Sequence, residues 1–217
     1  MAVDRTATYV PETDEFNVDA RPEQATSTAI AAGWAAAEIT PVTYAEEFKF
    51  SEGTFQVVKF LDEDGPFAVY RQHFLTQKTD GKKSYISLGA NDPLCTKLGS
   101  KPEEKRAFSV LNLSAPGGPV RQMLIASPRL YKSLHTAHFS PQGPLNKNYW
   151  ALSRSGKMQQ TTYNINPVKP RDLMEDWNID EAAAEAASAA AKPFTRADLK
   201  EPTWDELETI ANSLLGH

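Results

Sequence analysis

Basic residues alternate with aromatic residues in four short stretches of this sequence that have the composition of β-strands. The stretches are 70–74, 82–85, 105–108 and 149–154. Cationic side chains bind phosphates, and aromatic rings stack on bases at about 1–3 kcal/mol per base with little sequence preference. Because alternate residues of a strand face the same side, we expect Trp150 and Arg154 to share one face, and Tyr70 and Phe74 to share one face. The pattern predicts a surface that binds single-stranded nucleic acid.

The predicted DNA-binding residues come from several predicted strands and their connections. They are Lys59, Tyr70, Arg71, Phe74, Lys82, Lys83, Tyr85, Lys105, Arg106, Phe108, Arg121, Trp150, Arg154, Lys157, Tyr163 and Lys169. The alternative for each aromatic residue is a place inside a small β-barrel, which needs large interior side chains. The loop 153–157 either clamps backbone phosphates or forms a simple hairpin tip with exposed charges.

The charge distribution supports a polyanionic partner, although the chain as a whole is acidic. The net charge is −5, but residues 48–172 carry +9, and the segments 1–47 and 173–217 each carry −7. A basic segment of this size in an acidic protein favours nucleic-acid binding. A tethered acidic segment has a high effective concentration near such a surface.

Three residues are weak candidates for metal ligands. Cys95 follows a proline-containing turn that resembles half of a zinc ribbon, but Asp92 stands where the second cysteine would be. His73 is the third candidate, and His135 and His138 lie three residues apart on a predicted helix. A structural zinc site is built from four nitrogen or sulfur ligands. We therefore expect no cofactor, with zinc as the alternative. The single cysteine also excludes an intramolecular disulfide.

The sequence has no motif that indicates catalysis. Its carboxylates in the basic segment are scattered, and it has neither a phosphate-binding Walker loop nor a nucleophile elbow. We therefore expect a binding protein and not an enzyme. The main alternative is a protein-interaction or assembly module without nucleic-acid binding, and the other is a divergent nuclease.

Turn signals and hydrophobic alternation predict a mainly β core with added helices. Strands are expected at 54–61, 67–75, 84–88, 106–113, 120–126, 149–154 and 161–165, with a helix from Ser127–Pro128 to His138. This order suggests a small Greek-key barrel of the OB type with an inserted ribbon or loop region. We assign residues 1–47 to an acidic arm that is partly helical, with a short helix at 26–38, or disordered. Residues 48–177 are assigned to the core and residues 178–217 to an acidic helical tail.

The C-terminal tail contains one amphipathic helix and one segment without large apolar residues. Residues 180–191 are expected to have nothing to bury. A capping box at Thr203 and Glu206 begins a helix to residue 215. Its apolar face, Trp204, Leu207 and Leu214, is predicted to bind a partner protein, and the alternative is packing on the chain's own core.

The segment from about residue 48 to 177 resembles tailed-phage single-stranded DNA-binding proteins of the helix-destabilising kind, whose OB fold carries a zinc ribbon. The resemblance rests on 67–74, 83–86, 92–95, 127–131, 149–157 and 167–173. It implies sequence-nonspecific DNA binding in a cleft during phage replication or recombination, and self-association on DNA. It also implies that the acidic C-terminal region recruits replication proteins and competes with DNA for the cleft. His73 and Cys95 match the family's metal-binding positions, whereas Asp92 and Ser87 stand where relatives carry cysteine.

The first residues lack the basic start and apolar run of a signal peptide, and no stretch has the roughly 18 apolar residues of a membrane-spanning helix. We therefore expect a cytoplasmic protein, located in the host-cell cytoplasm if it is phage-encoded.

Overall fold

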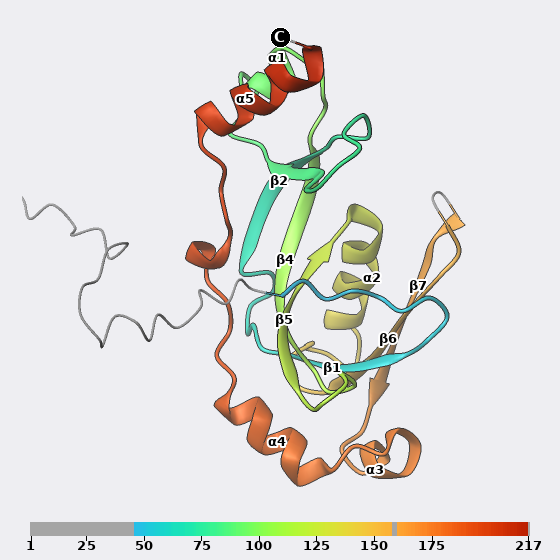
Figure 1. The fold of residues 1–217 in the computed structure, drawn as a ribbon. Helices are drawn as coiled ribbons and strands as arrows, with labels where there is room; N and C mark the ends of the chain where they lie inside the picture. The colour runs from blue at the N-terminus through green and yellow to red at the C-terminus, as the bar shows by residue number, and fades with distance from the viewer. Residues whose placement is uncertain (1–45, 158–159, 217) are drawn as a thin grey trace, which may run out of the picture. The chain divides into compact units, whose positions relative to one another are not determined.

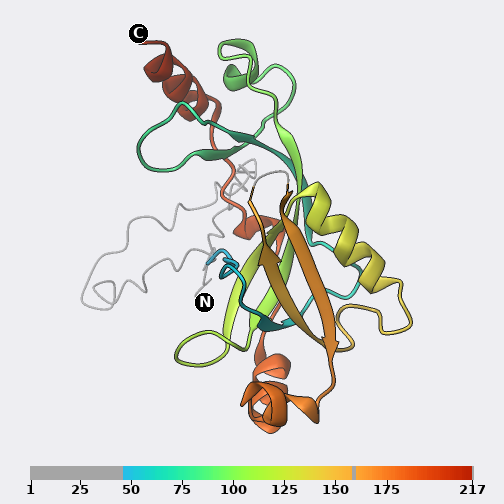
Figure 2. The ribbon, with the colours of Figure 1, turned by 90° about the vertical axis from the view of Figure 1, so that its right-hand side faces the viewer.

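The computed structural model describes residues 46–157 and 160–216, which belong to one unit of the chain. Figures 1 and 2 show a twisted sheet with helices around it. The strands are β1 (Gln56–Phe60), β2 (Ala68–Phe74), β3 (Ser84–Ile86), β4 (Glu103–Asn112), β5 (Val120–Ala126), β6 (Tyr149–Ser155) and β7 (Thr162–Val168). The helices are α1 (Pro93–Thr96), α2 (Pro128–His138), α3 (Asp172–Trp177), α4 (Glu181–Ala190), the 3-10 turn η3 (Arg196–Asp198) and α5 (Trp204–Leu215).

The seven strands form one antiparallel sheet in which β4 is the central element. The order is β3-β2-β4-β1-β6-β7, and β5 pairs with the other edge of β4. The first half of β4 pairs with β2 and its second half pairs with β1. In the described residues, β5 pairs with β4 and β7 pairs with β6, so the sheet is open between β5 and β7. The predicted mainly β fold with added helices is confirmed at this level.

One face of the sheet packs against α2, and we call it the inner face. Its core includes Phe60, Phe108, Leu124 and Trp150, and Leu130 and Leu134 of α2 are buried among them. Ser127 caps α2 through its side chain, and Pro128 occupies the first turn, as the sequence predicts. Helix α2 contacts β4, β5 and β7, so it lies across the open side of the sheet.

The opposite face, which we call the outer face, is covered by the C-terminal segment. Leu173 and Ala184 pack with Val57 and Ala151, and Trp177 adds partly buried surface. The expectation that residues 180–191 bury nothing is wrong. They form α4, and its small Ala184 side chain fits closely against the sheet where a large one would not.

Beyond α4 the chain runs along the outer face toward the far end of the sheet (Figure 1). Phe194 is buried against Ala107 and Met123, so residues 192–201 form a strap across β4 and β5. Helix α5 then packs beside α1 at the end of the β2–β3 ribbon, a region we call the tip. Leu207 and Ala211 of α5 are fully buried there with Leu75 and Leu94.

The expected elements agree with the structure for most of the core. Strand β5 has the expected bounds, and β7 extends three residues further than expected. The helix expected at 26–38 and nearly all of the acidic arm lie outside the described residues. Among the residues that are described, no helix has the length and apolar character needed to cross a membrane.

Candidate nucleic-acid interface

The alternation of side chains divides the predicted DNA-binding residues between the two faces of the sheet. Directly opposed residues of antiparallel strands share a face. Arg154 opposes Tyr163, and each lies two residues from the inner-face residues Leu152 and Ile165. Arg106 lies two residues before Phe108 on β4, so it also belongs to the inner face. The same rule places Lys105 and its partner Tyr70 on the outer face.

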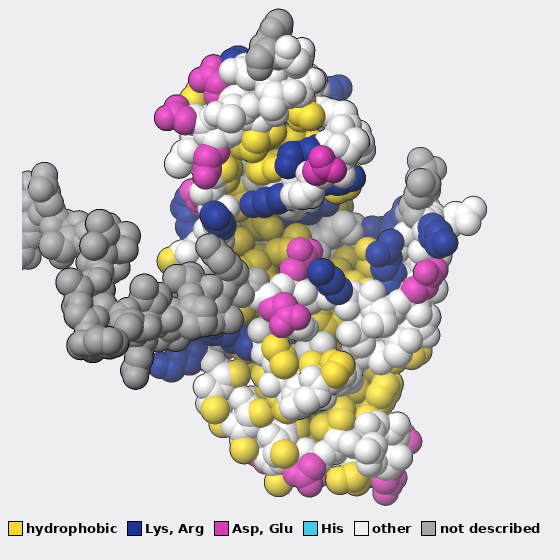
Figure 3. All heavy atoms as spheres, in the orientation of Figure 1, with side chains coloured by type: hydrophobic (Ala, Val, Ile, Leu, Met, Phe, Trp, Pro, Cys, Tyr) yellow, Lys and Arg dark blue, Asp and Glu magenta, His cyan; other side chains and the backbone are white. Residues whose placement is uncertain are grey.

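The inner-face cations lie beyond the end of the buried core. Arg106 opposes Val69, and Arg71 opposes Glu104, so both arginines extend the inner face along the β2–β4 ribbon. Arg154 extends it along the β6–β7 hairpin. Figure 3 shows Lys and Arg side chains over the ribbon and over the hairpin, with hydrophobic atoms between these two regions. The inner face therefore presents arginines on two separate elements that border one apolar area.

Aromatic rings lie next to these arginines. The guanidinium of Arg106 lies 3.8 Å from the centroid of the Tyr131 ring, and Arg106 also pairs with Glu104. The ring of Tyr163 lies 5.4 Å from that of Phe50. In the part of the chain that the structure describes, neither Arg71 nor Arg154 forms an ion pair. Both arginines are exposed, so they can bind an anionic ligand.

Three of the predicted stacking residues are buried and cannot stack on bases in this conformation. Trp150 is 1% exposed, and its Nε1 donates a hydrogen bond to the carbonyl of Leu145 at 2.7 Å. Phe108 packs edge-on against Phe60, and Tyr85 is buried in the tip. Their burial argues against DNA contact for these three rings. Each ring lies on a strand segment whose face is covered by a helix, and this packing removes the ring from solvent.

The outer-face candidates are engaged by neighbouring parts of the chain. Lys59 lies 5.0 Å from the centroid of the Tyr149 ring and donates to the carbonyl of Lys147, and burial lowers its pKa. Lys105 pairs with Glu103 at 2.9 Å. Burial, together with the charge of Glu47, raises the pKa of Tyr70 to about 12. These three side chains therefore interact with other parts of the protein on the outer face, which the C-terminal segment also covers.

Arg121 is the outer-face residue most closely tied to the strap. Its guanidinium lies 4.1 Å from the centroid of the Phe194 ring, and Nη1 donates to the carbonyl of Lys192 at 3.0 Å. The pKa of the Asp198 carboxyl is lowered mainly by the hydrogen bond from the Thr195 backbone. The positive charge of Arg121 lowers this pKa further. Arg121 thus has a clear role in holding the strap.

The remaining candidates lie at the margins. Phe74 is 62% exposed at the end of β2, and Lys82 and Lys83 lie in the β2–β3 connection. The ammonium of Lys82 lies 5.3 Å from the centroid of the Tyr85 ring. Lys157 is exposed at the β6–β7 hairpin tip, and Lys169 is exposed just after β7, at the opposite end of that strand. The structure therefore does not bring all the predicted residues into one surface.

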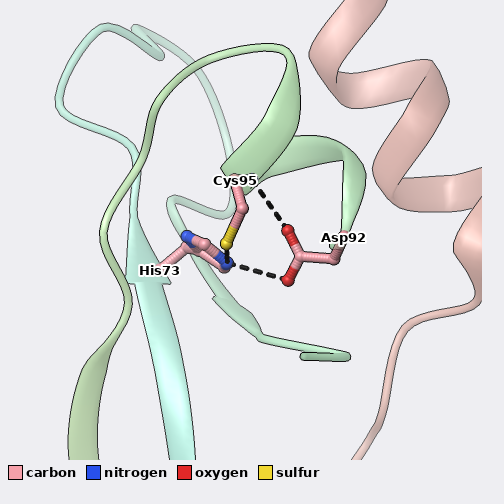
Figure 4. A group of neighbouring side chains, drawn as sticks. All are labelled: His73, Asp92 and Cys95. Carbon is pink, nitrogen blue, oxygen red and sulfur yellow. Dashed lines mark hydrogen bonds and ion pairs between the residues drawn. The ribbon is translucent and has the colours of Figure 1, made fainter. Parts of the chain in front are cut away.

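The three metal-ligand candidates do meet, at the tip. His73, Asp92 and Cys95 offer ligand atoms that lie within 4.8 Å of one another (Figure 4). Nε2 of His73 lies 3.0 Å from Oδ2 of Asp92 and 3.8 Å from Sγ of Cys95. Ser87 joins the group, because its hydroxyl donates to the same Asp92 oxygen at 2.7 Å. The four positions singled out by the family resemblance are therefore neighbours in space.

The Asp92 carboxylate is already occupied by hydrogen bonds. Oδ2 accepts from His73, Ser87 and the Leu88 amide, and Oδ1 accepts from the Cys95 amide at 2.8 Å, capping α1. Burial acts to raise the pKa of Asp92, but these hydrogen bonds and the His73 charge outweigh it and lower the pKa to about 2. The donor set supplies one nitrogen, one sulfur and one carboxylate, short of the four nitrogen or sulfur ligands of a structural zinc site.

The predicted partner-binding face of α5 is largely turned toward the chain itself. Leu207 is fully buried, and Leu214 packs on the same cluster. Lys97 beside α1 holds the helix through Glu208 at 2.6 Å and Asn212 at 2.9 Å. Leu207 and Leu214 are thus covered while α5 is docked, as in the alternative stated above. Trp204 is 48% exposed, so it is the one residue of the three that remains largely free for a partner.

In comparisons with known proteins, no family model, no curated protein and no solved structure matched this chain.

Two aromatic residues whose rings contribute to the inner face, Phe50 and Tyr131, were missed by the sequence analysis. Phe50 precedes the first strand and Tyr131 lies on a helix, so the alternation along strands that predicts the surface does not reach them. Residues two apart on a helix do not share a face, and Arg129 donates from Nη1 to the carbonyl of Thr161, which links α2 to the β6–β7 hairpin.

Proposed function

We propose that this protein binds single-stranded nucleic acid, without sequence preference, on the inner face between the β2–β4 ribbon and the β6–β7 hairpin. The observation that carries the proposal is that Arg71, Arg106 and Arg154 share one face of the sheet with the rings of Tyr131 and Tyr163. Arginines bind phosphates as bidentate donors, and the adjacent rings offer stacking surfaces for bases.

The arrangement favours a single strand over a duplex. Duplex DNA keeps the faces of its bases stacked inside the helix, so rings on a protein surface cannot reach them without distorting it. A single strand can turn its bases toward the rings while its phosphates meet the arginines. The apolar area between the ribbon and the hairpin can accommodate bases that a single strand turns toward the protein.

The proposal extends to biological role and fold family. We propose that the protein coats and protects single-stranded DNA in phage replication or recombination, and that the fold is an OB-like barrel variant in which α2 occupies the gap between β5 and β7. The acidic α5, with Asp205 and Glu206 in its first turn and Trp204 exposed, is the proposed contact for a replication or recombination protein.

The test is a binding titration with oligo-dT and with a duplex of equal length, at several salt concentrations. Tighter binding to the single strand and a steep fall in affinity with salt are expected, because each neutralised phosphate of a single strand contributes about 0.7 to the slope of log affinity against log salt. The Arg71→Ala/Arg154→Ala variant should lower that slope by about 1.4.

A matched control removes two cations elsewhere. The Lys105→Ala/Lys169→Ala variant loses the same charge from the outer face and from the far end of β7, and it should keep nearly the full slope. Equal losses in the two variants would show that only net charge matters, and would remove the inner face as the site. A chain with no affinity for oligonucleotides would instead support a protein-interaction module.

A further inference from the structure

Helix α2 carries a row of aromatic rings on its surface. Tyr131, His135 and Phe139 follow one another at intervals of four residues, so they lie on one side of the helix. The Tyr131 and His135 rings have centroids 5.6 Å apart, and the His135 and Phe139 centroids are 4.7 Å apart. His138 joins the end of the row, 4.7 Å from Phe139. We call these four rings the ring ladder.

Only the first ring of the ring ladder, Tyr131, packs against the core. Leu130 and Leu134 are the buried residues of α2, and they face the inner core cluster. Phe139 is 72% exposed, and His135 is also exposed. Exposed large rings gain little from folding, because the hydrophobic effect scales with the apolar area removed from water. Their alignment therefore needs another reason.

The ring ladder starts at the proposed nucleic-acid surface. Its first ring, Tyr131, is the one that stacks with the guanidinium of the inner-face residue Arg106. From there the ladder leads along α2, beside a hollow of about 150 Å³ lined by residues of the β1–β2 turn and by Leu145. Because Arg106 of the inner face contacts Tyr131 of the ring ladder, a strand bound to the inner face can continue directly onto the ladder.

The charges near the ring ladder are few. Arg106 is the cation at its first ring, and α2 has no carboxylate. Arg129 and Lys132 of α2 lie toward the β6–β7 hairpin, where Arg129 donates to the Thr161 carbonyl and Lys132 lines a hollow with Tyr163. Asp64 of the β1–β2 turn is the acidic residue that lines the hollow beside the ladder. Stacking on successive rings needs little sequence preference, since every base has a π-face.

We propose that the ring ladder is a second segment of the nucleic-acid site, on which bases of a longer single strand stack after they leave the inner face. The inference rests on the proposed function, because it needs a strand that is already bound by Arg71, Arg106 and Arg154. It assigns to Tyr131, His135 and Phe139 a role in setting how many nucleotides the protein covers. A short strand would occupy the inner face alone, whereas a longer one would reach Phe139.

The experiment compares two oligo-dT lengths, about 5 and about 15 nucleotides, which span the range covered by single binding folds. Phe139→Ala and the double variant His135→Ala/Phe139→Ala should weaken binding of the longer strand by about fivefold or more, and leave the shorter one unchanged. The matched control is Phe74→Ala. Phe74 is similarly exposed, and although it was predicted from the sequence to bind DNA, alternation along β2 places it with Tyr70 on the outer face, away from the proposed site. The control variant should leave both affinities unchanged.

A direct readout is available from a reporter. Phe139→Trp should show fluorescence quenching on binding the longer strand, and Phe74→Trp should not. If the unaltered chain binds oligo-dT and Arg71→Ala/Arg154→Ala weakens it, while the ladder variants bind both lengths normally, the ladder inference fails and the inner-face site stands. If the unaltered chain does not bind oligo-dT at all, the proposed function itself fails.

Discussion

Asp62 gives a test of how the strap is fastened to the sheet. Its carboxylate accepts hydrogen bonds from the amide and the hydroxyl of Ser109, at 2.6 and 2.8 Å. The Ser109 hydroxyl oxygen in turn accepts from the amide of Phe194 at 2.8 Å. Burial raises the pKa of Asp62 to about 6, although both hydrogen bonds from Ser109 act to lower it. The charged form is thus costly in the folded protein.

The raised pKa fixes the sign of the pH dependence. Between the ordinary value of 3.8 and about 6, the folded state binds this proton more tightly than the unfolded state does. The contribution of Asp62 to the free energy of unfolding is therefore fully present below 3.8 and is lost as the pH rises through about 6. The difference in pKa corresponds to about 3 kcal/mol. Partial exposure of the carboxyl reduces this to about 1–2 kcal/mol.

The assay is urea unfolding of the unaltered chain and of Asp62→Asn, at a series of pH values from about 4 to about 7. Asparagine keeps an oxygen that can accept from the Ser109 amide but does not titrate. From about pH 4 to about pH 7 the free energy of unfolding of the unaltered chain should fall by about 1–2 kcal/mol more than that of the variant. Parallel pH curves for the two proteins would refute the assignment.

Three further outcomes are expected. Leu207→Ala should lower the free energy of unfolding, measured in urea, by about 2–5 kcal/mol, because it leaves a cavity in the tip. Trp204→Ala should change that free energy by no more than about 0.5 kcal/mol, because Trp204 is 48% exposed. Equal effects of the two variants would contradict the docking of α5. Trp150→Phe should keep the affinity of the unaltered chain for oligo-dT, because Trp150 is 1% exposed, and a loss of affinity by a variant that remains folded would place Trp150 in the site. A chelator should leave the Tm unchanged while His73→Ala lowers it, since the Asp92 oxygens already accept four hydrogen bonds; a Tm that falls with chelator and is restored by zinc would show a metal site.

Local patterns were sufficient to predict most of the elements. Alternation and turn residues gave the strands, and Ser127 with Pro128 gave the start of α2, because these signals depend on neighbours in sequence. Alternation also correctly placed Trp150 and Arg154 on one face. It could not show that the buried core ends between Leu152 and Arg154, so that Trp150 is covered and Arg154 is not.

The contacts of the C-terminal segment could not be predicted in this way. The capping box at Thr203 and Glu206 predicted α5 and is present in the structure. Whether Leu207 meets a partner protein or the chain's own Leu94 depends on surfaces that are distant in sequence, and no local pattern reports it. The ring ladder was missed for a simpler reason, since aromatic residues were sought at the spacing of strands and not at that of a helix.

The docking of α5 has a consequence for the order in which the protein takes shape during synthesis. Lys97 and Glu208, which join the tip to α5, are separated by 111 residues. A chain is made from its N-terminus, and contacts this distant form late. The apolar side chains of Leu75 and Leu94 therefore emerge from the ribosome long before Leu207 arrives to cover them, and until then the tip presents apolar surface at which unwanted association can occur.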